Sequence, residues 1–357
     1  MRLAIIAVTS KGANLADQLA QSLKLDVTVY AKQGRTTNRL HHTYEKVSTV
    51  IDEIFAVYDG LIFIMATGIV VRVIAPHITD KRFDPAVVVL DDMGKHAISL
   101  LSGHLGGANE LTLTVAKAID AVPVITTASD TAQKVAADTL AVKLNLAIEP
   151  FDQLKVLNAS IVNEDRVLFC LDGQLPEAAT YHRLAEEMGV NLETMDRLGD
   201  TDSYDSAVVI TDKDLYMTKP HVYLRPATLF VGIGCRRGTS SAMIYEALTQ
   251  SCKKIGRSMK SIAALATVDI KKDEIGLLSA SQQLALPVKY YNSKTLQACV
   301  NQYKLTESDF VKEQIGVGNV CEAAAILGGK SHKLLLPKTK YQKVTIAISE
   351  VNSLLSE

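Results

Sequence analysis

The chain has 357 residues, of which 48% are hydrophobic, and its 38 Lys and Arg side chains nearly balance 39 Asp and Glu. A chain of this length can form several domains, and its charge balance provides no broad basic surface for nucleic acid. The five cysteines lack metal-ligand spacing, so we expect free thiols and no metal site. The longest apolar stretch, residues 61–75, is too short to cross a membrane. We therefore expect a cytoplasmic protein with no membrane or nucleic-acid partner.

Apolar runs and helical patterns alternate over residues 1–145. The run at 3–8 is apolar throughout, as expected for a strand covered on both faces, and Leu15, Leu19 and Leu23 then recur at helical spacing. A tight turn at 91–95 separates two later strands. The alternation predicts an N-terminal α/β domain with a doubly wound, mostly parallel sheet. Strands are predicted at 3–8, 27–30, 61–65, 87–90, 97–101 and 122–125, and helices include 105–119 and 131–144.

The remainder of the chain is predicted to hold two further parts. Residues 146–226 are less regular and predict a small α/β middle segment, with strands at 167–171, 207–210 and 222–224. Regular alternation resumes at Leu229, so residues 227–357 are predicted to form a separate α/β C-terminal domain.

A glycine-rich turn near the start of this last domain is a candidate anion site. The N–H groups around Gly232 and Gly234 are expected to point out of the turn at the start of a helix. Arg236 and Arg237 add donors for carboxylates, and Thr239 stands at the expected helix start. The pattern is not a full dinucleotide fingerprint, because its third glycine comes one position late. Glycines that serve only a tight turn are the structural alternative.

Residues 102–109 form the segment with the clearest catalytic chemistry. His104 is a candidate general base, and the N–H groups of Gly106 and Gly107 are candidate oxyanion donors. Ser102 and Asn109 flank the same turn. A histidine that only caps or covers a turn is the structural alternative.

Two other segments carry candidate binding residues. Thr67 and Gly68, and likewise residues 126–130, follow strands and are expected at the sheet edge where open α/β folds bind ligands; Arg72 lies one helical turn later. Gly318 and Asn319 open another predicted helix, for which an Asn-led capping box is the structural alternative.

These motifs, in this order, resemble the CbiG family, the cobalt-precorrin-5A hydrolases of anaerobic cobalamin biosynthesis. The similarity rests on residues 64–72, 97–109, 231–239 and 318–325 and extends over the whole chain, although the middle segment contributes no matching motif. The resemblance implies a corrinoid substrate whose δ-lactone is opened by water, with release of acetaldehyde. It implies no cofactor of the protein, because cobalt is carried within the substrate, and neighbouring cobalamin-pathway enzymes as partners.

The hypothesis is therefore a lactone hydrolase in which His104 activates water and Gly106 and Gly107 stabilise the oxyanion. The alternatives are a tetrapyrrole carrier without chemistry and an NADP-dependent oxidoreductase that uses the turn at Gly232. The predicted substrate-binding residues are Thr67, Gly68, Arg72, Ser102, Asn109, Gly232, Gly234, Arg236, Arg237, Thr239, Gly318 and Asn319.

Overall fold

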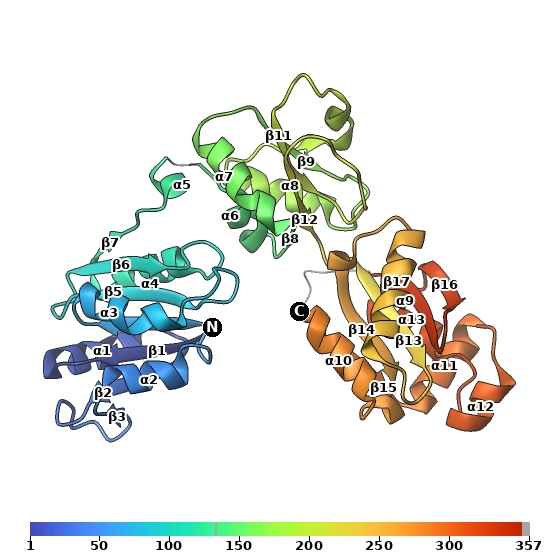
Figure 1. Ribbon diagram of the computed structural model, residues 1–357, viewed down its shortest axis with the longest axis horizontal. Helices are drawn as coiled ribbons and strands as arrows, with labels where there is room; N and C mark the ends of the chain where they lie inside the picture. The colour runs from blue at the N-terminus through green and yellow to red at the C-terminus, as the bar shows by residue number, and fades with distance from the viewer. Residues whose placement is uncertain (133, 352–357) are drawn as a thin grey trace. The chain divides into compact units, whose positions relative to one another are not determined.

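Three β-sheets organise the chain in the computed structural model, which describes residues 1–132 and 134–351 (Figure 1). The chain divides into two compact units, Met1–Val142 and Lys143–Glu357. The first unit contains a seven-stranded sheet, and the second contains both five-stranded sheets. The boundaries expected at residues 145 and 226 stay predictions.

The N-terminal sheet has the strand order β3-β2-β1-β4-β5-β6-β7. Neighbouring strands from β3 to β5 are parallel, β6 is antiparallel to β5, and β7 is parallel to β6. The last two strands therefore run against the other five. The strands are β1 (Arg2–Ala7), β2 (Asp26–Lys32), β3 (His42–Tyr44), β4 (Gly60–Ile64), β5 (Ala86–Leu90), β6 (His96–Leu101) and β7 (Val122–Val124).

Helices cover both faces of this sheet because alternate residues of each strand point to opposite sides. Leu3 and Ile5 of β1 pack with the buried faces of α1 and α4, whereas Ala4 and Ile6 pack with α2 and α3. The predicted doubly wound α/β architecture is confirmed. The helices of this unit are α1 (Ser10–Ser22), α2 (Val47–Ile54), α3 (Thr67–Ile74), η1 (Ala75–His77), α4 (Ala108–Ile119), α5 (Ala128–Thr131) and α6 (Ala137–Lys143), the last extending one residue into the second unit. The single helix predicted at 131–144 is wrong, since α5 and α6 are separate.

The middle sheet has the order β10-β9-β11-β12-β8, with only β8 antiparallel to its neighbour. All three strands predicted in this segment are present. Helix α7 contacts β9, β11 and β12, and α8 contacts β9. The elements are β8 (Ala147–Glu149), η2 (Phe151–Gln153), α7 (Leu154–Val162), β9 (Val167–Leu171), α8 (Ala178–Glu187), β10 (Glu193–Thr194), η3 (Met195–Gly199), β11 (Ser206–Ile210) and β12 (His221–Arg225).

The C-terminal sheet has the order β15-β14-β13-β17-β16 and is covered on both faces. One core contains apolar residues of β13, α9 and α10, and the other contains residues of β14, α11 and α13. The elements are β13 (Leu229–Cys235), α9 (Ser241–Lys254), η4 (Met259–Ser261), β14 (Ile262–Val268), η5 (Asp269–Lys271), α10 (Ile275–Leu284), β15 (Val288–Tyr291), α11 (Ser293–Tyr303), α12 (Asp309–Ile315), α13 (Val320–Gly329), β16 (Leu334–Lys340) and β17 (Val344–Glu350).

Gly232 lies inside a strand and not in the turn that its sequence pattern predicts. It belongs to β13, and a Cβ there would lie 1.8 Å from the carbonyl oxygen of Cys321 on α13. Gly328 on α13 also has no room for a side chain, because a Cβ there would lie 1.8 Å from a carbon of the Phe230 ring. Glycine is therefore required at these positions because α13 packs directly on β13. This packing corrects the expected position of the buried Gly232 in a turn, whereas its substrate-binding role stays a prediction.

This packing predicts that Gly232→Ala lowers the free energy of unfolding by about 1–3 kcal/mol, because α13 must move away from β13. Gly173→Ala is the matched control, since nothing lies within 4 Å of a Cβ at Gly173, and its effect should stay within about 0.5 kcal/mol. Chemical denaturation of both variants measures the difference. Equal stabilities would show that α13 yields without cost and would contradict the packing argument.

Candidate active site

Polar residues gather at both edges of the N-terminal sheet. Thr67 follows β4 at one edge, whereas Ser102 follows β6 at the other, because β6 runs antiparallel to β5. The position of the second edge is confirmed by Gly106, where a Cβ would lie 3.3 Å from the carbonyl oxygen of Asp84, just before β5. A strand of five residues such as β4 spans roughly 17 Å. The expectation that Thr67 and residues 126–130 share one edge is therefore wrong.

His104 lies between two carboxylates in the turn after β6. Its Nε2 atom is 3.0 Å from Oδ2 of Asp130 and 3.2 Å from the Ser129 hydroxyl. Its Nδ1 atom contacts the Thr139 hydroxyl and lies 3.5 Å from Oδ1 of Asp138. The imidazole is 12% exposed, so the surrounding groups determine its orientation.

The two carboxylates have different surroundings. The Asp138 side chain is 7% exposed and faces Nδ1, whereas the Asp130 side chain is 41% exposed and faces Nε2. A buried carboxylate beside one ring nitrogen orients a histidine and stabilises the imidazolium that forms when the other nitrogen accepts a proton. His104 therefore has the surroundings of a general base whose Nε2 side is the more open one.

Asn109 holds this cluster together from the first turn of α4. Its Oδ1 atom accepts a hydrogen bond from Ser99 at 2.6 Å, and its Nδ2 atom donates to Thr127 at 2.9 Å and to Asp130 at 3.0 Å. The Thr127 hydroxyl also donates to Asp130. With its amide committed to these contacts, the buried Asn109 positions the Asp130 carboxylate, and its expected substrate-binding role stays a prediction.

Close contacts within the turn require its glycines. A Cβ at Gly103 would lie 2.9 Å from Oδ1 of Asn109, and one at Gly106 would lie 2.4 Å from the Cβ of Ser102. Ser102 itself has φ 59°, a left-handed conformation that is strained for a non-glycine residue. Within the described residues its buried hydroxyl has no hydrogen-bond partner. Unpaired buried hydroxyls are uncommon, so the Ser102 hydroxyl calls for a partner that the described chain does not supply.

Only one of the two predicted oxyanion donors is free. The Gly107 N–H donates to the carbonyl oxygen of His104 at 3.0 Å, which closes the turn. Gly107 is therefore not an oxyanion donor in this conformation. The Gly106 N–H donates to no acceptor in the part of the chain that the structure describes.

Thr67, Gly68 and Arg72 belong to the opposite edge of the same sheet. They lie on α3, which follows β4. The neighbouring strands β1 and β4 mark the point where the strand order reverses and where doubly wound sheets bind ligands. Gly68 and Arg72 are exposed, and Nη1 of Arg72 donates to the Gly68 carbonyl oxygen at 3.0 Å. Their binding role stays a prediction, but it is separate from the His104 cluster.

The predicted anion turn after β13 already holds a carboxylate of the chain. The Gly238 N–H donates to Oε1 of Glu274 at 2.8 Å, and Glu274 is buried beside Lys271 at 3.3 Å. The Gly234 carbonyl oxygen accepts from Thr345, and the Gly234 Cβ position is blocked 2.5 Å from that hydroxyl. The Gly238 N–H and the Gly234 carbonyl oxygen are therefore already hydrogen-bonded within the chain.

The side chains of this turn differ in whether other residues of the chain already bind them. Arg237 pairs with Asp273 at 3.1 Å, and Thr239 is buried with its hydroxyl donated to the Arg236 carbonyl oxygen. The Thr239 hydroxyl is therefore already committed within the chain, its binding role stays a prediction, and Ser240 caps α9. Arg236 is exposed and is the best remaining carboxylate donor of the turn.

Gly318 and Asn319 have structural roles. Asn319 is fully buried and caps α13, accepting from the Glu322 N–H at 3.2 Å and donating to the Thr306 carbonyl oxygen at 3.0 Å. A Cβ at Gly318 would lie 2.5 Å from Oε2 of Glu307. The capping interpretation is confirmed, and the substrate-binding role of both residues stays a prediction that no contact among the described residues supports.

Asp130, Asp138 and Thr139 are the residues of the His104 cluster to which sequence reasoning gave no catalytic role. Asp130 was expected as a member of the ligand edge at 126–130 and as a possible helix cap. The missed signal is the short turn at 91–95, which joins adjacent strands and requires antiparallel pairing. That reversal places the ends of β6 and β7 together.

Three family models match consecutive parts of the chain. Cobalamin synthesis G N-terminal matches residues 49–130, the cobalamin biosynthesis central region matches 135–226, and cobalamin synthesis G C-terminus matches 229–349. Within the described residues no helix is long and apolar enough to span a membrane, and no group of three or more His, Cys, Asp or Glu side chains is arranged to hold a metal ion.

Relatives resemble the chain over almost its whole length. A cobalt-precorrin-5A hydrolase from Priestia megaterium is 34% identical, covering 97% of this chain and 94% of its own. One from Salmonella typhimurium is 33% identical, covering 97% of each. A crystal structure of a cobalamin biosynthesis protein G homologue from Sulfolobus solfataricus is 18% identical, covering 98% and 97%, with a TM-score of 0.39.

The matches define a hydrolase of cobalamin biosynthesis, and its sheets belong to a mixed α and β architecture. The chain belongs to the CbiG family.

The pKa values of the cysteine thiols predict that no cysteine acts as the nucleophile. Burial raises the thiol pKa of Cys170 and Cys252 to about 12 and of Cys299 and Cys321 to about 11, and it also raises the pKa of Cys235. Because a raised pKa leaves the thiol protonated near neutral pH, iodoacetamide should modify the native chain slowly and leave hydrolase activity unchanged. Mass spectrometry with an activity assay checks this, with the denatured chain as control. Rapid labelling of one native cysteine with loss of activity would contradict it.

Proposed function

We propose that this chain hydrolyses cobalt-precorrin-5A, opening its δ-lactone and releasing acetaldehyde to give cobalt-precorrin-5B. The observation that carries the proposal is the near full-length similarity to relatives of that name. The His104 cluster supports it, because lactone opening requires an activated water and a polar site for the developing oxyanion.

In the proposed first step, Nε2 of neutral His104 takes a proton from water, the Nε2–H so formed donates to Asp130, and the water oxygen attacks the lactone carbonyl carbon. Asp138, beside Nδ1, stabilises the imidazolium. The unpaired Gly106 N–H and Ser102 hydroxyl are the donors available to the carbonyl oxygen as it gains charge. Collapse of the tetrahedral intermediate breaks the ester C–O bond, leaving a carboxyl group and a hydroxyl on the former bridging carbon.

The second step breaks a carbon–carbon bond. Loss of the hydroxyl proton allows a C=O bond to form while the electron pair of the breaking C–C bond moves into the conjugated macrocycle. The bridging carbon then leaves with its methyl group as acetaldehyde. The same imidazole is suited to accept this proton once it has released the first.

The proposal also covers the cofactor, the residues that bind substrate carboxylates, the location and the partners of the enzyme. Cobalt enters within the substrate, so we propose no cofactor held by the protein. Arg236 and Arg72 are proposed carboxylate ligands, since both are exposed cations beside strand ends. We propose the cytoplasm as the location and neighbouring cobalamin-pathway enzymes as partners.

The two alternatives, a nicotinamide enzyme and a tetrapyrrole carrier, predict different observations. A nicotinamide enzyme would use Gly232 to approach a pyrophosphate, but that position is occupied by the packing of α13. A carrier without chemistry would return the bound pigment with unchanged mass after incubation with cobalt-precorrin-5A.

The roles predict that His104→Ala lowers the rate of acetaldehyde release by roughly 10²–10⁴-fold, because the proton acceptor is lost. Asp130→Asn should also slow release, while corrinoid binding, followed by absorbance, stays near that of the unmodified chain. His182→Ala, an exposed histidine on α8, is the matched control. Full turnover by the His104 variant would remove this residue from the mechanism.

A further inference from the structure

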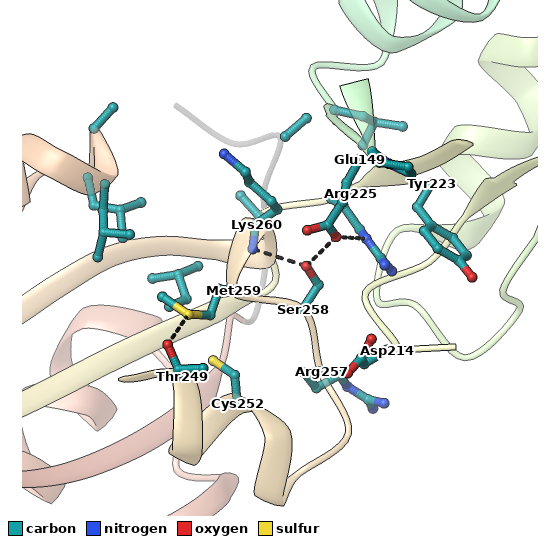
Figure 2. Close-up of a pocket in the computed structure, with 18 of the residues that line it drawn as sticks. Glu149, Asp214, Tyr223, Arg225, Thr249, Cys252, Arg257, Ser258, Met259 and Lys260 are labelled. Atoms are coloured by element: carbon teal, nitrogen blue, oxygen red, sulfur yellow. Dashed lines mark hydrogen bonds and ion pairs between the residues drawn. The ribbon is translucent and has the colours of Figure 1, made fainter. Parts of the chain in front are cut away.

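The second unit contains a cavity of about 1020 Å³ that the His104 chemistry does not use. Its lining comes from β8 and β12 of the middle sheet and from α9, η4 and α10 of the C-terminal part (Figure 2). This volume is at the upper end of the range for small-molecule sites, so the cavity can accept a large ligand.

A fixed polar group forms one wall. Arg225, only 2% exposed, donates through Nε to Oε2 of Glu149 at 2.8 Å, and the Ser258 hydroxyl donates to the same oxygen at 2.7 Å. Figure 2 shows Glu149 between Arg225 and Ser258. The Arg225 guanidinium also lies 4.0 Å from the ring centroid of Tyr223. These charges neutralise each other, so this wall is preorganised and carries little net charge.

Two lysines at the cavity are available for a ligand. Lys253 on α9 and Lys260 on η4 are exposed, and their ammonium groups have no ion-pair partner among the described residues. Arg257 pairs with Asp212 at 3.2 Å. Asp214 also lines the cavity, and its negative charge offsets part of the positive charge of the two lysines. The net charge available to a ligand is therefore positive, and it is carried by two separate ammonium groups.

The remaining lining favours an apolar body over a compact phosphate. Ile262, Leu284, Leu286 and Met259 contribute apolar surface. The cavity also meets the carboxyl-terminal turns of α9 and α10, the negative ends of their helix dipoles, which disfavour a concentrated negative charge. Flexible lysines can instead reach separated carboxylates at the rim of a ring.

We propose that this cavity binds a polycarboxylate tetrapyrrole ring, with Lys253 and Lys260 contacting its acid groups and the apolar lining contacting its face. The choice of ligand class rests on the proposed function, but the site is separate from the His104 cluster.

The test is an absorbance titration of the full chain with uroporphyrin I, a polycarboxylate ring that has no lactone. Lys253→Ala combined with Lys260→Ala should raise the Kd roughly tenfold, because two lysine–carboxylate contacts are lost. Lys254→Ala, an exposed lysine adjacent to Lys253 but outside the lining, should leave the Kd unchanged. Thr249→Trp, which adds a bulky ring to the cavity lining without altering charge, should also raise the Kd.

Equal Kd values for the unmodified chain, the double lysine variant and the Lys254 control would overturn the proposal, as would failure of uroporphyrin I to bind. Tighter binding of ATP than of uroporphyrin I at the same cavity would also overturn it, in favour of a nucleotide. The titration involves no turnover, so a chain that binds the porphyrin but releases no acetaldehyde would contradict the proposed function and leave this site standing.

Discussion

The antiparallel pairing of β5 with β6 determines which polar groups of the N-terminal sheet can meet. A single reversal of chain direction sends β6 and β7 back across the sheet, so their ends deliver His104 and Asp130 to the same edge. Asn109 then links the two strand ends through its amide. Without that reversal, His104 would lie beside Thr67 at the opposite edge, away from the carboxylates that orient it.

Glycines in this chain mostly permit close packing. Gly232 admits the backbone of α13, and Gly103 and Gly106 let the turn at 102–107 fold onto Asn109 and Ser102. Where glycine-rich segments leave N–H groups exposed, the chain often satisfies them itself, as Glu274 does at Gly238. In the turn at 102–107, the Ser102 hydroxyl and the Gly106 N–H have no partner among the described residues, and they are informative because they lie in the same turn as His104.

Local patterns predicted the elements better than the contacts between them. The apolar run at 61–65 became β4, and Asn319 became a helix cap, since both depend on neighbouring residues. The roles of Gly232 and Asp130 depend on residues far along the chain, namely Cys321 and His104. No spacing within a short segment shows such contacts. The direction of β6 was predictable in principle from the turn at 91–95, and that direction alone would have brought Asp130 to His104.

A double-mutant cycle on lactone opening tests most directly whether His104 and Asp130 act as one unit. Rates are compared for the unmodified chain, His104→Ala, Asp130→Asn and the combined variant. The account predicts that the combined variant is no slower than His104→Ala alone, because Asp130 acts through the imidazole. Effects that multiply would show that the two side chains act independently and would contradict the account.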